Sequence, residues 1–438
     1  MGNTTLVVND PSDGAPATPD PTDTAPVSDR PHKTITGDIL AGDTDVDSPG
    51  PLTVTPGTFS TNDGGTVTLQ ADGDFTFEPA PATSCTDTSD FFDYTVTDSG
   101  SPAKTDTGRV TIALTGCVWY VNNDDAQGNS GTSEKPFDTL AQAETASGTG
   151  HSIFVYDGND TSSGYASGIN LKANQKLIGE AATLTVGSDA LHSADAANRP
   201  TITDNNADVV DLDDATEVRG FNIDPQGTGG GIAGSAGDTG GGTIGDVNIV
   251  DAGTADTQPG LELDATTGTW DISNLTVSNS GAPGVRLNNA GTVNFHSAGT
   301  ISVTTSGAKG LDAAGTNMGT STFDAITVTG SATGGVAMTN TTGITTFGDL
   351  ALTTTSGATP AFLLSIAGAV SGPSTGAANL SATGGPAVDM TGTSGATLSF
   401  DDVDSTNSST DGINLDLLRR RATPPGGGYT GGAPATCP

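Results

Sequence analysis

The stretch that decides the fold starts at Gly260-Leu-Glu-Leu263, because variants of this pattern return six more times. Each copy opens with Gly or Ala and has apolar residues at its second place and, in all but one, its fourth. The later copies are Gly284-Val-Arg-Leu, Gly310-Leu-Asp-Ala, Gly335-Val-Ala-Met, Ala361-Phe-Leu-Leu, Ala387-Val-Asp-Met and Gly412-Ile-Asn-Leu. Steps of 24 to 26 residues indicate a repeat in which each unit buries its apolar face only against the next. We therefore predict a solenoid.

The repeat unit is composed like strands and turns. It is rich in Gly, Thr, Ser and Asp, and its apolar residues fall at i and i+2, the period of a strand with one buried face. Two further apolar pairs recur in each unit, as in Val247/Ile249 and Trp270/Ile272. Three short strands per unit predict a three-faced parallel β-helix with about 25 residues per coil. In this register Val336 points inward between Leu311 and Phe362, and Ala337 faces water.

The composition excludes several classes of partner. Of 438 residues, 51 are acidic and 14 basic, so the formal charge is −37. Phosphate binding needs clustered Lys and Arg, so we expect neither nucleic acid nor an anionic membrane as partner. No apolar run approaches the ~20 residues that span a bilayer. Met1 does not open a signal peptide, and we expect a segment or processed form of a longer exported protein, located outside the cell or on its surface.

The first part of the chain differs from the repeats. Residues 1–33 hold a strand-like segment (Thr4, Thr5, Leu6, Val7 and Val8) followed by Asp/Pro-rich sequence, in which Pro disfavours helix and central strand. From residue 34 to 117 the pattern is all-β. Thr66-Val-Thr-Leu69 and Asp74-Phe-Thr-Phe77 flank a turn and predict a hairpin.

This region also resembles a known family. Gly37-Asp-Ile-Leu-Ala-Gly-Asp-Thr-Asp-Val-Asp47, the segment from Gly65 to Phe77, and Asp90-Phe-Phe-Asp-Tyr-Thr-Val-Thr-Asp98 resemble a bacterial cadherin-like/Ig-like surface repeat. The resemblance implies a β-sandwich of the kind found in adhesins and other long exported proteins of prokaryotes.

Two features of this module could stabilise it. Asp43, Asp45 and Asp47 alternate in a turn and could offer oxygens to one Ca²⁺, although the twelfth position counted from Asp43 is Val54 rather than the Glu of an EF-hand. A polar turn is the alternative, and no other cofactor is expected. Cys85 precedes one predicted strand and Cys117 follows another, so we expect a disulfide between them, with Cys437 left over.

A second resemblance covers residues 118–418. Glu134-Lys-Pro-Phe-Asp-Thr-Leu-Ala-Gln-Ala-Glu-Thr-Ala146, followed by His151-Ser-Ile-Phe-Val-Tyr-Asp-Gly158, resembles the entry of a pectate-lyase-like parallel β-helix, and this resemblance implies a right-handed coil. The residues around 137–146 predict a short helix that caps the first coil. Gln175–Glu180 and Val218–Ile223 are expected as early coils. The Arg/Pro/Gly-rich tail, residues 419–438, is expected to add none.

An enzyme on this scaffold would need acidic residues with suitable partners. Asp411 lies in a Thr-Asp-Gly-Ile segment that resembles part of the polygalacturonase motif. No His follows it, and the arginines that follow it are all in the irregular tail. Asp211, Asp213 and Asp214 form an acidic group with Arg219 as the one nearby base. We interpret both as structural, with cation binding by the second group as an alternative. The four histidines have no zinc-type spacing and are His32, His151, His192 and His296.

Three functions remain at this point. The first is a non-enzymatic extracellular structural or adhesive protein with a β-solenoid stalk, whose ligand would be a carbohydrate or another cell-surface molecule. The second is a self-assembling filament subunit, a homo-oligomer in which Thr4–Val8 completes the sheet of a neighbour. The third is a polysaccharide lyase or hydrolase.

Overall fold

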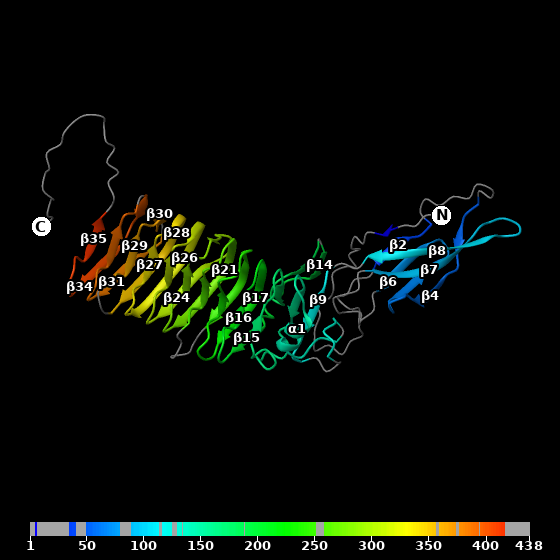
Figure 1. The fold of residues 1–438 in the computed structure, drawn as a ribbon, viewed down its shortest axis with the longest axis horizontal. Helices are drawn as coiled ribbons and strands as arrows, with labels where there is room; N and C mark the ends of the chain where they lie inside the picture. Colours follow the sequence, from blue (N-terminus) through cyan, green and yellow to red (C-terminus); the bar gives the residue numbers. More distant parts are fainter. Residues whose placement is uncertain are drawn as a thin grey trace, which may run out of the picture.

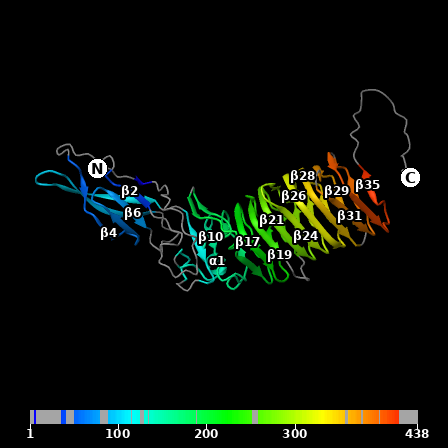
Figure 2. The same cartoon turned by 180° about the vertical axis from the view of Figure 1, so that it is seen from behind.

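The protein is almost entirely β-structure in the computed structural model, which describes residues 5–6, 35–40, 50–78, 89–113, 116–124, 129–133, 135–187, 189–250, 258–355, 359–373, 376–393 and 395–416. The described residues form 35 strands and one helix. Two small sheets precede a long column of stacked strands, as Figure 1 shows and Figure 2 shows from behind.

The N-terminal unit consists of two four-stranded sheets, as the sequence predicts. One sheet has the order β1-β8-β7-β3 and the other β2-β6-β5-β4. Its core consists of alternate strand residues such as Val67, Phe77 and Ile112, each at most 2% exposed. The predicted hairpin is β5–β6, with Leu69 opposite Phe75 and Gly73 at φ +99° in the turn. The strands are β1 Thr5–Leu6, β2 Ile35–Asp38, β3 Thr53–Val54, β4 Gly57–Ser60, β5 Thr66–Leu69, β6 Asp74–Glu78, β7 Ser89–Thr97 and β8 Thr105–Ala113.

The seven repeated segments are neighbouring strands of one parallel sheet of ten, which confirms the solenoid. Leu261, Val285, Leu311, Val336, Phe362, Val388 and Ile413 align across it in the predicted register. We call it the repeat sheet. Its strands are β11 Ile169–Asn170, β16 Val210–Asp211, β18 Ile232–Gly234, β20 Leu261–Asp264, β22 Val285–Asn288, β25 Leu311–Ala314, β27 Val336–Thr339, β29 Phe362–Ser365, β32 Val388–Thr391 and β35 Ile413–Asp416.

The rest of each coil belongs to a second, fifteen-stranded sheet, and here the expectation of three separate strands is partly wrong. In several coils the two remaining strands run into each other through one corner residue. Gly220, Asp246 and Asn274 stack at this corner with φ of 84°, 53° and 47°. The strands are β9 Val118–Val121, β10 Ser152–Val155, β12 Lys176–Gly179, β15 Thr201–Asp204, β17 Thr216–Pro225, β19 Gly242–Val250, β21 Thr269–Ser280, β23 Thr292–Phe295, β24 Ile301–Ser306, β26 Asn317–Ser331, β28 Thr342–Thr354, β30 Ala369–Gly372, β31 Ala378–Thr383, β33 Ala396–Leu398 and β34 Asp402–Thr406.

Ladders of aligned side chains fill the interior. Val336 is fully buried between Leu311 and Phe362, as predicted. Ala337, expected to face water, is only 5% exposed. Its methyl group lies between the longer side chains of Asp312 and Leu363 on the adjacent coils, so a position on the outer face does not make it accessible.

The predicted capping helix is α1, Leu140–Ala146, at the N-terminal end of the column (Figure 1). It starts later than expected because Thr139 is its N-cap, with Gln142 completing a capping box. Leu140 and Ala143 are buried in the main core, so the helix covers the first coil as expected.

The sequence did not predict an antiparallel hairpin inserted after β12. It consists of β13, Leu184–Val186, and β14, Asp189–His192. Leu184 packs with Tyr120, Phe154, Tyr156 and Ile178 in a small second core on the outer side of the first coils. The outer side of these coils is therefore covered rather than solvated.

Candidate functional sites

The acidic group around Asp211 lies on the outer side of the repeat sheet, in β16. Burial, followed by the carboxylates of Asp208 and Asp238, raises the pKa of Asp211 to about 6. No basic side chain contributes to this shift. A carboxyl group with a raised pKa can hold a proton near neutral pH, but acid–base catalysis also requires a positioned partner.

Asp214 anchors a turn between coils. Its Oδ1 accepts hydrogen bonds from the Gly240 amide at 2.9 Å, from the Thr239 hydroxyl at 3.1 Å and from the Thr239 amide. The amides of Gly240 and Thr239 lower the pKa of Asp214. Asp213 accepts from the amide of Asp214 at 2.6 Å. These bonds support the structural interpretation of both residues.

Arg219 does not pair with this acidic group. It lies in β17 of the other sheet, where its Nε is 2.5 Å from Glu217 Oε1 and its Nη2 donates to the carbonyl of Thr183 at 3.3 Å. Asp411 is exposed in the turn before β35. The structure therefore does not assemble the acid–base pair that the sequence offered.

A buried carboxyl group that sequence reasoning missed is Glu180, only 2% exposed. Its Oε2 accepts from the amide of Asp157 at 2.9 Å, and burial raises the pKa of Glu180 to about 7. Burial and the neighbouring Asp160 carboxyl raise the pKa of Asp157 to about 6. In sequence Glu180 only follows a short strand, and nothing there signals burial.

The three described histidines have different surroundings. His192 is 2% exposed, and burial lowers its pKa to about 4. His151 Nδ1 accepts from Trp119 Nε1 at 3.0 Å and from the Gly148 amide at 2.8 Å, which fixes it beside the capping helix. His32 lies outside the described residues.

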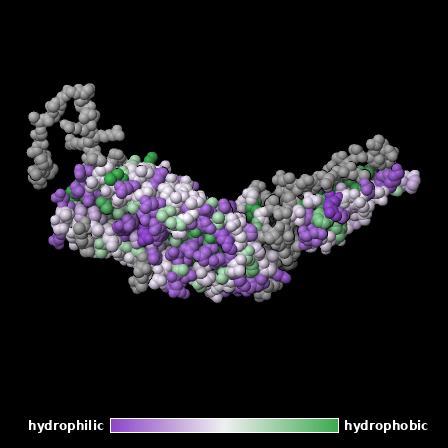
Figure 3. All heavy atoms as spheres, viewed as in Figure 1, coloured by the Kyte–Doolittle hydropathy of each residue, from purple (hydrophilic) through white to green (hydrophobic). Residues whose placement is uncertain are grey.

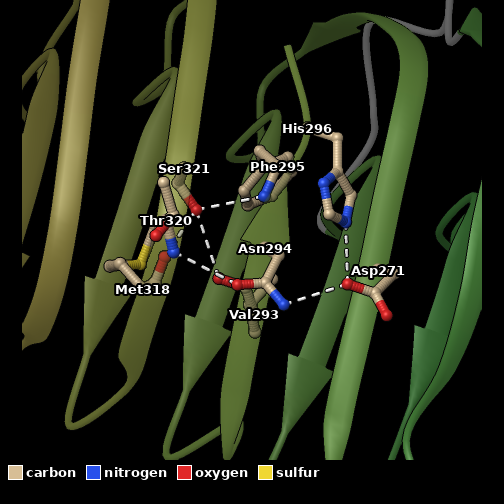
Figure 4. Close-up of polar contacts among 8 residues, drawn as sticks. All are labelled: Asp271, Val293, Asn294, Phe295, His296, Met318, Thr320 and Ser321. Atoms are coloured by element: carbon tan, nitrogen blue, oxygen red, sulfur yellow. Dashed lines mark hydrogen bonds and ion pairs between the residues drawn. The ribbon is translucent and has the colours of Figure 1, made fainter. Parts of the chain in front are cut away.

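His296 belongs to a chain of polar contacts across three coils (Figure 4). Asp271 Oδ1 is 2.7 Å from His296 Nε2 and accepts from Asn294 Nδ2 at 2.9 Å, while Asn294 Oδ1 accepts from the Thr320 amide at 3.1 Å. Burial raises the pKa of Asp271, but the bonds from His296 and Asn294 outweigh it and leave the pKa below its usual value.

The hydroxyl group of Ser321, drawn in Figure 4, is not an accessible nucleophile. Ser321 is 1% exposed, and its Oγ lies 2.6 Å from the carbonyl oxygen of Met318 and 3.1 Å from that of Val293, and accepts from the Phe295 amide. The contacts in Figure 4 tie coils together.

Neither a metal site nor a membrane-spanning helix is found in the described ranges. Within the described ranges, no group of three or more His, Cys, Asp or Glu side chains could hold a metal ion, and no helix is long and apolar enough to cross a membrane. Asp43, Asp45 and Asp47 lie outside those ranges, so calcium binding there stays a prediction.

The predicted disulfide and the N-terminal strand are described in part. Cys117 is disulfide-bonded, while Cys85 and Cys437 lie outside the described residues, so the pairing with Cys85 stays a prediction. Thr5 and Leu6 pair in parallel with Thr111 and Ile112 of the same chain. Thr4, Val7 and Val8 are not among the described residues, nor is the tail from 419 to 438.

Comparison with known proteins identifies one part of the chain. Residues 9–113 match the model of the bacterial Ig domain family, and this match confirms an N-terminal Ig-like unit. The matched range begins at residue 9, ahead of residue 34, where the all-β sequence pattern starts. No curated protein and no solved structure matches the chain.

Proposed function

We propose that this protein is a non-enzymatic structural or adhesive component of a prokaryotic cell surface, in which the solenoid is a rigid spacer behind the Ig domain. The observation that carries the proposal is the union of a bacterial Ig domain with a regular parallel solenoid. The solenoid suits an extended assembly, because it grows by stacking coils along one axis.

The surface of the solenoid supports a spacer. Its outward carboxylates and amides bond to residues of adjacent coils, as Asp389 does with Asn414 and Asp264 with Asn288. Figure 3 shows apolar residues scattered among polar ones on the visible face. Such bonds stiffen the column along its axis.

The test is labelling of intact native cells with antibodies against the Ig domain, with an antibody against a cytosolic protein as control. We expect labelling without permeabilisation. Labelling that requires permeabilised cells would overturn the proposal. Release of reducing ends or unsaturated products from acidic polysaccharides, abolished by Asp211→Asn but not by Asp411→Asn, would favour the polysaccharide-degrading alternative instead.

A filament subunit is the second candidate, favoured by the position of β1. This strand pairs with β8 through Thr5 and Leu6, yet 28 residues separate it from β2. A connection of that length could span up to ~90 Å if extended, so the same edge of β8 is within reach of a neighbour's strand.

A cysteine pair tests this second candidate. Thr5→Cys combined with Thr111→Cys should cross-link within one chain in a monomer and between chains in a filament. A mixture of two differently tagged single variants distinguishes these results, because cross-linked species carrying both tags form only by exchange. Their absence at every protein concentration, together with no fibres by electron microscopy, would refute strand donation.

A further inference from the structure

The Ig domain contains a cavity of about 240 Å³ at the edge between its two sheets. It lies where β3 ends and the chain crosses to β4. The residues that line it include Thr55, Phe59, Leu69, Asp93, Tyr94 and Thr107.

The cavity exists because β3 is short. It pairs with β7 only through Thr53 and Val54. The Thr55 amide then donates to the carbonyl of Thr95 at 3.2 Å, and Pro56, which has no N–H, begins the crossing. The chain returns to this edge of β7 at Asn62, whose amide donates to the carbonyl of Phe91 at 3.0 Å.

One backbone unit of β7 is left open between these two contacts. In an antiparallel pair, alternate residues direct both backbone groups to the same side. The carbonyls of Phe91 and Thr95 are bonded on the β3 side, so the N–H and C=O of Asp93 point there too. No residue in the described part of the chain bonds them there. A peptide strand cannot add along an edge blocked on both sides, whereas a small molecule can enter.

The side chains around this opening combine apolar and polar groups. Leu69 is 3% and Tyr94 8% exposed, and the ring of Phe59 is half-buried with its centroid 5.8 Å from that of Phe92. Thr55 and Thr107 are exposed residues that carry hydroxyl groups and line the cavity.

Asp93 is the charged group that lines the cavity, and its side chain is 58% exposed. Its carboxylate is held by Arg109, with Nε–Oδ1 at 2.7 Å and Nη2–Oδ2 at 3.0 Å. A bidentate pair of this kind fixes the plane of the carboxylate, and its oxygens can still accept further hydrogen bonds. The hydrogen bond from Arg109 also lowers the pKa of Asp93.

We propose that this cavity binds one neutral sugar unit, such as the terminal residue of a surface glycan. An aromatic ring beside fixed acceptors and hydroxyls suits a sugar, which has apolar C–H groups on its ring faces and hydroxyls at its rim. The volume lies below the ~300 Å³ at which drug-sized sites begin, so one unit fits rather than a chain. The charge of −37 and the carboxylate of Asp93 disfavour an anionic sugar. This inference rests on the proposed function, and the sugar would be the ligand that its adhesive role requires.

The experiment is saturation-transfer NMR of the full chain with methyl glycosides of neutral hexoses and N-acetylhexosamines, followed by titration. We expect at least one to bind, with millimolar affinity. Thr107→Val removes a rim hydroxyl without changing its shape and should weaken binding about five- to tenfold, the loss of one hydrogen bond. Thr76→Val is the matched control, on an exposed position of β6 outside the cavity, and should bind as wild type.

A second variant tests the aromatic wall. Phe59→Leu keeps apolar volume and removes the ring, so binding should fall below detection while circular dichroism stays unchanged. If Phe59→Leu unfolds the domain, the comparison of Thr107→Val with Thr76→Val decides alone. Absence of binding by every neutral glycoside, or binding that both threonine variants leave unchanged, would overturn the proposal. Either result would overturn sugar binding without affecting the labelling of intact cells, which tests the proposed function. Labelling that depends on permeabilisation would refute the proposed function and would leave sugar binding by the cavity untouched.

Discussion

Replacing Ile366 by Asn should stabilise the solenoid, although it removes a large apolar side chain. Ile366 directly follows β29 and has φ +54°. The residues at the same corner in other coils also have positive φ, and they are Ala265, Asn289, Gly315, Asn340 and Gly392. The left-handed conformation is therefore imposed by the stack, and at Ile366 it falls on a β-branched residue, for which it is a genuine outlier.

The magnitude follows from two opposing contributions. A left-handed conformation costs an ordinary L-residue roughly 1–2 kcal/mol, and Asn adopts it more readily. Ile366 is 58% exposed, so less than half of the ~1.5–3 kcal/mol that full burial contributes is lost on substitution. The net gain should be about 0.5–1 kcal/mol.

Ile344→Asn is the matched control. Ile344 is 50% exposed, lies in β28 and is not among the residues with positive φ. The same chemical change there loses burial and relieves nothing, so stability should fall by about 1 kcal/mol. Guanidinium unfolding followed by circular dichroism measures both, and thermal midpoints should differ by a few degrees. Equal losses in the two variants would refute the strain at Ile366.

Three further predictions concern the core, pH and the disulfide. Val336→Asp should cost at least about 3 kcal/mol, because it leaves an unpaired charge in the core. Leu363→Asn on the outer face, beside Asp389, should cost under about 1 kcal/mol, and comparable losses in denaturant unfolding would show a wrong register. The pKa of Glu180 is raised from 4.5 to about 7 on folding, so its stabilising contribution, complete below pH 4.5, is lost as pH rises through about 7. The Glu180→Gln variant should therefore lose less stability than the wild type between pH 5 and 8, as measured by thermal unfolding. Identical pH profiles for the two proteins would contradict the raised pKa of Glu180. Peptide mapping without reductant should recover Cys117 linked to Cys85, and a link to Cys437 would show the predicted pairing to be wrong.

The repeat register could be predicted because the solenoid makes one demand on every coil. Leu311, Val336 and Phe362 are read correctly from their spacing alone, since inward positions must stay apolar to bury the column. The exposure of an outward position depends instead on the side chains next to it on the adjacent coils. Ala337 is buried because it is smaller than Asp312 and Leu363, and a period of two carries no information about side-chain length.

The path of each coil was harder to foresee than its core. The corner at Gly220, Asp246 and Asn274 is occupied by three residue types that share only a tolerance of positive φ. A single such residue turns the chain without interrupting pairing, so two predicted strands become one. The capping helix was predictable because Leu140 and Ala143 share a face, while its start depended on the capping box at Thr139.

The candidate sites were the least predictable part, because burial and not residue type decides their chemistry. Asp211, Asp213 and Asp214 are conspicuous in sequence, yet Asp214 is held by backbone amides, and no basic side chain in the described ranges shifts the pKa of Asp211. Glu180 is inconspicuous, and its pKa is raised because the side chain is buried, although the hydrogen bond from the Asp157 amide acts in the opposite direction. The cavity of the Ig domain left one trace in the sequence, Thr55-Pro56, where a strand stops and its partner's edge stays open. A proline that ends a short strand beside a longer one therefore marks the position of this cavity, whereas the acidic clusters do not mark one.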